Sequence, residues 1–208
     1  MSKIRLHHAD PAAIDDAMET LENGGLVVFP TDTVYGVGAS VRRSDAVARL
    51  YVAKGRPLER AIPVLVSGED SVGSLATEVH EFAGALMRRY WPGPLTIVLP
   101  AAEWLPEEII RDTGCVGVRM PDHPVALELI RRSGGALATT SANRSGEPET
   151  RTAVDAAEQI GDRVDLVLDG GESPGGVPST VVKIESDGSW TILRTGAITE
   201  AQIARVIG

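Results

Sequence analysis

The sequence predicts an α/β domain built on a mixed sheet, and three observations indicate it. Short aliphatic runs alternate along the chain with segments whose apolar residues recur at helical spacing, as do strands and helices of one layered sheet. The last two aliphatic runs are joined by "ESDGS" at residues 185–189, a hairpin signal that makes one strand pair antiparallel. No long linker, repeat or low-complexity tract interrupts the 208 residues, so we expect a single domain over residues 1–208.

Six helices are expected from their start signals, and the first four also carry apolar residues at helical spacing. Their starts are marked, in chain order, by Asp10-Pro11, Ser44, Thr77, Asp122, Thr152 and Thr199. Glycine or proline follows the first four, at Gly24-Gly25, Gly55, "WPGP" (91–94) and Gly134-Gly135. In the last helix Thr199 and Gln202 have the spacing of a capping box, and Ile198 can act as a hydrophobic staple.

Eight aliphatic runs are expected to be strands. They lie at residues 26–29, 62–66, 95–99, 116–120, 136–140, 166–168, 180–184 and 190–194. The first five are almost continuously apolar, which is typical of strands covered on both faces. Aromatic residues make up only 4% of the chain, so aliphatic side chains are expected to fill the core.

Composition and charge exclude several classes of protein. The net charge of −9 disfavours a broad nucleic-acid groove, which needs many Lys and Arg contacts to phosphates, but it leaves room for a local basic cleft. The single cysteine, Cys115, excludes an internal disulfide and favours a reducing compartment. No apolar run reaches the ~18 residues that span a bilayer, and the first residues lack the apolar core of a signal peptide. We therefore expect a cytoplasmic protein with no membrane anchor.

Several common sites are absent from the sequence. It contains no P-loop, no complete dinucleotide fingerprint and no G-x-S-x-G nucleophile elbow. The four histidines show no ligand spacing, so no metal-binding residue is predicted. If the protein handles phosphate, it must use another device.

A cluster of cations at the end of the second predicted helix is one candidate for that device. Lys54, Arg56 and Arg60 fall within seven residues of an otherwise acidic chain. Lys54 alone would be explained by the favourable effect of a cation at a helix C-terminus, about 0.3–1 kcal/mol. That effect does not explain Arg56 between Gly55 and Pro57, a rigid bend that would present two cations to one point, as a polyphosphate clamp does.

Three further polar stretches follow predicted strands or lie next to them, and loops in such places are expected to gather at one sheet edge. They are residues 30–38 ("PTDTVYGVG"), residues 139–148 ("TTSANRSGEP"), and residues 175–184 together with 192–199, which contain Ser179 and Arg194. Arg119 also closes an apolar strand, where an arginine more often faces a ligand than the core because burying it unpaired is costly. Capping turns and surface ion pairs are the alternative explanations for these features.

Taken in order, these stretches resemble the motifs of the YrdC family, the threonylcarbamoyl-AMP synthases. The segments that carry the resemblance are "FPTDTVYGVGA", "AKGRP", "WPGPLTIVL", "VGVRMPDHPVALELI", "TTSANRSGEP" and "PSTVVKI" with "ILRTGAIT". They extend over roughly residues 15 to 200. Six motifs in the family's order are far more specific than any one of them.

The resemblance implies a twisted, open α/β sheet around a concave, positively charged cavity. It also implies an enzyme that combines L-threonine, bicarbonate and ATP into threonylcarbamoyl-AMP and releases pyrophosphate, with Mg²⁺ bound through the ATP phosphates. A tRNA threonylcarbamoyl transferase would then carry the threonylcarbamoyl group to an adenosine of tRNA, and the enzyme itself could contact tRNA.

The same resemblance implies roles for individual residues. Lys54 with Arg56, and Ser141 with Asn143, match the family's K-x-R and S-x-N signatures and would face the ATP phosphates, with Lys54 and Arg56 as the catalytic cations. The two pairs are therefore expected to converge across a hollow that leaves room for a triphosphate between them. The residues expected to bind ATP are Lys54, Arg56, Arg60, Cys115, Ser141, Asn143 and Arg194. The residues expected to bind threonine are Thr33, Tyr35, Arg119, Thr139 and Ser179. Arg119 is the natural partner of the threonine carboxylate, and Asp32 is expected to organise its loop.

Two alternatives to this enzyme stay open. Leu65 stands where many members have a histidine, and "PSTV" at residues 178–181 also occurs in a paralogous branch, so the enzyme could adenylate a different amine. The second alternative is a non-catalytic RNA-binding module in tRNA or ribosome maturation, against which the negative net charge weighs.

Overall fold

The computed structural model describes residues 5–55, 61–175 and 177–208, and it confirms an α/β fold with one mixed sheet. The strands of the described chain are β1 (Leu6–His8), β2 (Val27–Phe29), β3 (Gly36–Ser40), β4 (Val64–Val66), β5 (Leu95–Pro100), β6 (Cys115–Arg119), β7 (Ala136–Ser141), β8 (Leu166–Asp169), β9 (Thr180–Ile184) and β10 (Trp190–Arg194). They lie side by side in the order β1-β8-β2-β3-β7-β4-β6-β5-β9-β10. The pairs β1/β8, β2/β8, β4/β6 and β5/β9 are parallel, and the other pairs are antiparallel.

All eight predicted strands are confirmed, and two further strands were missed. β1 is three residues long and only partly buried, so it has no apolar run to reveal it. β3 was expected to be part of a polar loop at residues 30–38, and its strand conformation corrects that expectation. Its Gly36 and Gly38 serve packing within the sheet: a Cβ on Gly36 would lie 3.0 Å from a methyl group of Thr139, and one on Gly38 would lie 2.9 Å from the ring of Phe29.

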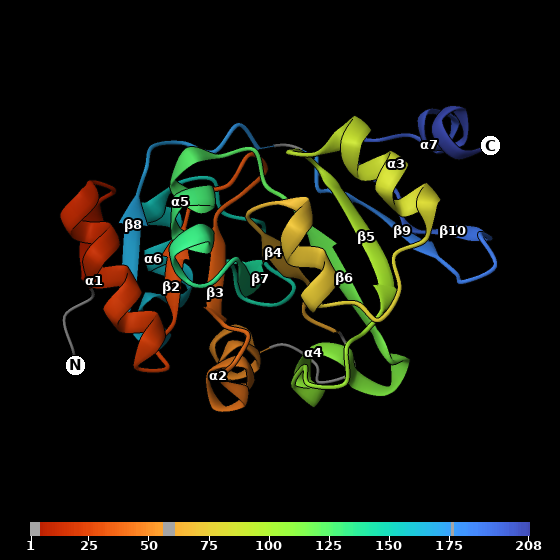
Figure 1. Ribbon diagram of the computed structural model, residues 1–208. Helices are drawn as coiled ribbons and strands as arrows, with labels where there is room; N and C mark the ends of the chain where they lie inside the picture. Colours follow the sequence, from red (N-terminus) through yellow and green to blue (C-terminus); the bar gives the residue numbers. More distant parts are fainter. Residues whose placement is uncertain (1–4, 56–60, 176) are drawn as a thin grey trace.

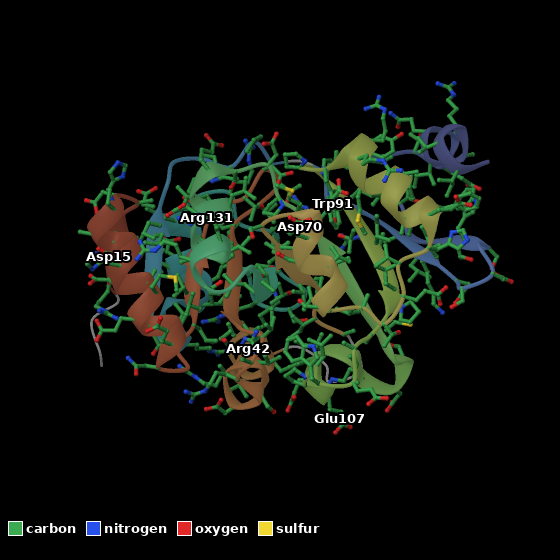
Figure 2. The ribbon with its side chains drawn as sticks, in the orientation of Figure 1. Asp15, Arg42, Asp70, Trp91, Glu107 and Arg131 are labelled. Atoms are coloured by element: carbon green, nitrogen blue, oxygen red, sulfur yellow. The ribbon has the colours of Figure 1, made fainter. Side chains whose placement is uncertain are left out.

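Seven α-helices flank the sheet in the described chain. They are α1 (Pro11–Glu22), α2 (Ser44–Lys54), α3 (Glu81–Tyr90), α4 (Glu107–Ile110), α5 (Pro124–Arg132), α6 (Ala153–Ile160) and α7 (Glu200–Ile207). In Figure 1, α1 and α5 lie over the part of the sheet that contains β8, β2 and β3, while α3 and α7 accompany β5 at the other end. Figure 2 shows charged side chains such as Asp15 of α1, Glu107 of α4 and Arg131 of α5 on the outer surface of these helices.

Several of the predicted helix caps are confirmed. The carboxylate of Asp10 accepts a hydrogen bond from the amide of Ala13, and Thr152 caps α6 in the same way. The capping box of Thr199 and Gln202 is formed at the start of α7. Gly55 ends α2 in the left-handed conformation (φ 60°), which glycine adopts without steric cost. The described residues contain no helix long and apolar enough to cross a bilayer.

Two predicted caps were wrong. Ser44 is the first residue of α2 instead of its cap, because its hydroxyl donates to the carboxylate of Glu108. Thr77 lies outside α3, which begins only at Glu81; the imidazole of His80 caps it by accepting from the amide of Phe82. The short helix α4 was not predicted, since four residues are too few for a helical period to show.

The two faces of the sheet carry separate hydrophobic clusters. One cluster joins α1 and α5 to Leu65, Leu137 and their neighbours, and the larger one lies on the other face, where Val64 and Ala138 point. This alternation follows from the pleat, which sends successive side chains to opposite faces. This alternation determines which side chains of the central strands can line a cavity on a given face of the sheet.

Candidate active site

A cavity of about 440 Å³ lies on the Leu65 face of the sheet. Alternate residues of the central strands reach it: Leu65 of β4, Thr96 and Val98 of β5, Cys115, Gly117 and Arg119 of β6, Thr139 and Ser141 of β7, and Val181 and Lys183 of β9. The segment before β3 adds Thr31, Thr33 and Tyr35, and the strand ends add Ser179 and Arg194. Strand register places Arg194, Val181 and Thr96 in one row across β10, β9 and β5.

Arg119 forms one corner of the cavity and is only 7% exposed. Its Nε donates to the carbonyl of Gly93 (3.0 Å), its Nη1 to Thr33 Oγ1 (3.2 Å), and its Nη2 to Asp32 Oδ1 (2.5 Å). Burial lowers the pKa of Arg119, the carboxylate of Asp32 opposes that shift, and the positive charge of Arg194 adds to it. A guanidinium has five N–H groups, so one N–H on each terminal nitrogen has no partner among the described residues.

Ser179 and Arg194 form the adjoining corner. Arg194 binds the backbone carbonyl of Ser179 through Nε (3.1 Å) and Nη2 (2.8 Å), and Nη2 also donates to Ser179 Oγ (2.9 Å). The hydroxyl of Thr96 lies 2.9 Å from the same Ser179 Oγ. Arg194 was expected at the nucleotide; the structure places its guanidinium against Ser179, a residue expected at threonine.

Lys54 and the S-x-N segment (Ser141 to Asn143) are in direct contact, without the expected space between them. Lys54 is 4% exposed, and its Nζ donates to the carbonyls of Ser141 (2.5 Å) and Asn143 (2.7 Å), to Asn143 Oδ1 (2.9 Å) and to Ser141 Oγ (3.2 Å). The expected gap for a triphosphate between Lys54 and these two residues is therefore absent. The chain leaves β7 here, so the carbonyls of residues 141 and 143 need a donor outside the sheet, and Lys54 supplies it.

Within the described lining of the cavity, Ser141 is present and Lys54 and Asn143 are not. Lys54 thus supports the wall from behind, and its catalytic role stays a prediction. Arg56 and Arg60, the other two cations of the predicted clamp, lie outside the described residues.

Tyr35 lines the cavity, but its hydroxyl is already engaged. The side chain is fully buried, and its hydroxyl donates to the carbonyl of Gly171 (2.6 Å) and accepts from the amide of Gly170 (3.3 Å). Burial raises the pKa of Tyr35 to about 12, and the nearby Asp169 carboxylate contributes to that rise. Tyr35 therefore ties the segment after β8 to the cavity wall, and threonine binding through its hydroxyl would require breaking these bonds.

Other lining residues carry further expectations. Cys115 is half-buried at the start of β6, Thr139 is buried on β7, and both line the cavity, as expected of residues in one pocket. Among the described lining residues, Arg119, Arg194 and Lys183 carry positive charge and Glu149 carries negative charge. Asp32 pairs with Arg119 and Glu185 with Lys183, so the positive character expected of the cavity stays a prediction.

Thr96 and Lys183 were missed by the sequence analysis. Both lie inside apolar strand runs, where a single polar residue looks like an incidental substitution. The signal that would have found them is the pleat itself, because each alternates with core residues such as Ile97 and Val182.

Comparison with known proteins shows the family to which the chain belongs. The Sua5/YciO/YrdC family model, which carries the description "Telomere recombination", matches residues 19–196. The chain belongs to the Sua5/YciO/YrdC family. The matched range includes every described candidate residue from Thr33 to Arg194, so the cavity lies within the part of the chain that the family model matches.

Members of the family with curated names are similar over most of this chain. A threonylcarbamoyl-AMP synthase of Pyrococcus abyssi is 40% identical over 190 residues, which is 90% of this chain and 55% of that protein. A putative threonylcarbamoyl-AMP synthase of Mycobacterium tuberculosis is 40% identical over 204 residues, 96% of this chain and 93% of that protein. The chain spans just over half the length of the Pyrococcus abyssi relative and of a Bacillus subtilis relative (56%).

Solved structures of the family share the fold. The crystal structure of Pyrococcus abyssi Sua5 complexed with L-threonine superimposes with a TM-score of 0.91 at 38% identity, over 98% of this chain and 60% of that chain. Escherichia coli YciO superimposes with a TM-score of 0.83 at 25% identity, over 95% of this chain and 97% of that chain.

Proposed function

We propose that this protein forms threonylcarbamoyl-AMP and pyrophosphate from L-threonine, bicarbonate and ATP. The observation that carries the proposal is the convergence of Arg119 and Arg194 with the hydroxyls of Thr33 and Ser179 in one cavity. These groups supply many hydrogen-bond donors and few acceptors, which suits a ligand rich in anionic oxygens. The names of the relatives support the proposal, and a related Sua5 structure holds L-threonine.

Threonine would bind with its carboxylate at Arg119. The ion pair with Asp32 and the bonds to Gly93 and Thr33 fix the guanidinium, and the two N–H groups without a partner would donate to the ligand. A cation held in this way loses little freedom when it binds a carboxylate. The hydroxyls of Thr139 and Ser179 would contact the rest of the amino acid.

The chemistry would need positioning more than a strong base. The threonine amine and bicarbonate form a carbamate, whose oxygen attacks the α-phosphorus of ATP while pyrophosphate leaves. Negative charge grows on the phosphates, so catalysis depends on fixed donors and cations aimed at that charge. Ser141 would contact a phosphate, Lys54 would hold Ser141 and Asn143 in place, and Arg56 would supply a further positive charge.

Mg²⁺ would be held by the phosphate oxygens of ATP and would neutralise part of their charge. Within the described residues, no group of three or more His, Cys, Asp or Glu side chains is gathered to hold a metal ion. Cys115 and Arg60 would contact the nucleotide, as their places in the sequence suggest. A tRNA threonylcarbamoyl transferase would receive the product in the cytoplasm, and any direct contact with tRNA is part of the same proposal.

The amino acid that supplies the amine needs a test of its own, because Leu65 lines the cavity where many members of the family have a histidine. Leu65 pairs with Arg119 across β4 and β6 and lines the cavity. An apolar side chain beside the carboxylate site would select among amino acids by shape, because it offers no hydrogen bond.

Pyrophosphate release from ATP tests the proposed function, with threonine and bicarbonate each omitted in turn and with serine, valine or alanine in place of threonine. Release that requires both co-substrates and prefers threonine supports it. Release with another amino acid but not with threonine points to a different amine. No turnover, together with RNA binding that weakens steeply with salt, would favour the RNA-binding alternative.

A further inference from the structure

Thr96 is buried in the cavity wall, and the reaction described above gives it no task. It is 5% exposed, and its hydroxyl lies 2.9 Å from Ser179 Oγ. Its methyl group lies over the bare backbone of Gly117, where an added Cβ would come within 3.3 Å of it. The methyl group therefore occupies the space above Gly117, and the hydroxyl is turned toward Ser179.

Counting protons shows what this pair of hydroxyls presents to the cavity. Ser179 Oγ accepts a hydrogen bond from Arg194 Nη2, which can only donate. The two hydroxyls share one further hydrogen bond, in which either atom is the donor. Whichever donates, the other hydroxyl keeps its proton, so one O–H of the pair has no partner among the described residues and is available to a ligand in the cavity that both residues line.

The surrounding guanidiniums add to this surplus of donors. Nη1 of Arg194 has no partner among the described residues, and Arg119 keeps one N–H on each terminal nitrogen. The two guanidiniums are close enough that the charge of Arg194 lowers the pKa of Arg119. Asp32 compensates one of these two cations, so the corner would accommodate an anion with several acceptor oxygens.

We propose that the Thr96–Ser179 hydroxyl pair and the Nη1 edge of Arg194 bind the oxygens that come from bicarbonate, and that Thr96 sets the affinity for bicarbonate. The assignment rests on the proposed function. The carbamate nitrogen is bonded to the same carbon as the threonine carboxylate, so the product of the first step has two anionic groups side by side. Arg119 holds one of them, and the neighbouring Thr96, Ser179 and Arg194 hold the other.

The same donors would serve bicarbonate and the carbamate. The amine nitrogen forms a bond to the bicarbonate carbon, a carbon–oxygen bond breaks, and the hydroxide leaves with an amine proton as water. One negative charge is present on the bicarbonate group before this step and on the carbamate group after it. Thr96 acts here as a binding and positioning residue, because the hydroxyl pair neither gains nor loses a proton.

Thr96→Val tests the proposal, since valine keeps the shape and the methyl group but removes the hydroxyl. Pyrophosphate release is measured in carbonate-free buffer with each substrate varied in turn. Loss of one hydrogen bond to an anion should raise the KM for bicarbonate about tenfold or more, with the KM for ATP and for threonine within about twofold of wild type. Thr96→Ser should restore the KM for bicarbonate to within about threefold, because the hydroxyl returns.

Thr191→Val is the matched control, because this exposed threonine of β10 does not line the cavity and its replacement should leave every KM unchanged. Ser179→Ala removes the other half of the pair and serves if Thr96→Val fails to fold; it too should raise the KM for bicarbonate more than that for ATP. Equal increases for all three substrates, or no increase, would overturn the assignment. A wild-type protein without threonine- and bicarbonate-dependent turnover would instead contradict the proposed function itself.

Discussion

Replacing Lys54 by methionine should destabilise the protein, because Lys54 is a buried structural cation. Its Nζ is the donor for two backbone carbonyls and two side-chain oxygens of Ser141 and Asn143. Methionine has a similar length and no branch, so the substitution removes the charge and the hydrogen bonds with little change in volume. The carbonyls of Ser141 and Asn143 would then lose this donor, and that of Asn143 is in a buried bond.

The magnitude follows from the number of contacts. Three N–H groups bonded at about 1.5–3 kcal/mol each contribute roughly 4–9 kcal/mol, against which burying an ammonium costs several kcal/mol. We expect a net loss of about 3 kcal/mol. For a domain of 150–250 residues, each kcal/mol shifts the Tm by about 2–4 °C, so Tm should fall by about 6–12 °C.

The matched control is Lys183→Met, at a lysine whose side chain is about one-third exposed and pairs with Glu185 at 2.7 Å. Such a pair is worth about 0–1 kcal/mol, so its Tm should stay within about 4 °C of wild type. Thermal unfolding followed by circular dichroism gives both values. If Lys54→Met melts as close to wild type as Lys183→Met does, the assignment of Lys54 as the support of the Ser141–Asn143 wall is refuted.

Three further predictions follow from the site and from the pKa shifts. Arg119→Lys should raise the KM for threonine at least about tenfold in the pyrophosphate assay and leave the KM for ATP nearly unchanged, because a single ammonium cannot replace a fork that binds Gly93 and the substrate together. Burial raises the pKa of Tyr35 to about 12, so the unfolded state releases this proton at lower pH than the folded state does. The free energy of unfolding should therefore fall by roughly 2–3 kcal/mol between about pH 10 and about pH 12. In urea titrations over this range, Tyr35→Phe should show a smaller fall than wild type. Burial lowers the pKa of His123, so the unfolded state takes up a proton at higher pH than the folded state does, and the free energy of unfolding should fall as the pH drops below about 6.5. This fall should be shallower in His123→Asn. Equal slopes of the free energy of unfolding against pH in the two proteins would contradict the prediction.

The sequence predicted most of the fold because its signals are local. Strands such as β5 and β7 are apolar runs bounded by glycine or proline, and helices such as α1 begin at a capping residue and end at glycine. β3 was missed because its glycines are required by packing against other strands: Gly36 lies against Thr139 of β7, about 100 residues away in the sequence, and Gly38 against Phe29 of β2. The cap of α3 escaped because an imidazole acceptor is not a usual start signal.

The sequence predicted which residues line the cavity better than it predicted how their side chains are arranged. Strand-end residues such as Arg119 and Ser179 do share one cavity with Thr33 and Cys115, as loops and strand ends on one side of a sheet suggested. The direction of the Lys54 side chain was not predictable, because it depends on how the end of α2 packs against the end of β7. The partners of Arg194 depend in the same way on the β9–β10 register.

Identifying the reaction product tests the proposed function most directly. The protein would be incubated with ATP, Mg²⁺, L-threonine and isotopically labelled bicarbonate, and the nucleotides would be separated and weighed by mass spectrometry. We expect an AMP adduct whose mass contains both threonine and the labelled carbon, formed in proportion to pyrophosphate. Pyrophosphate accompanied only by AMP, or by an adduct without the label, would contradict the account.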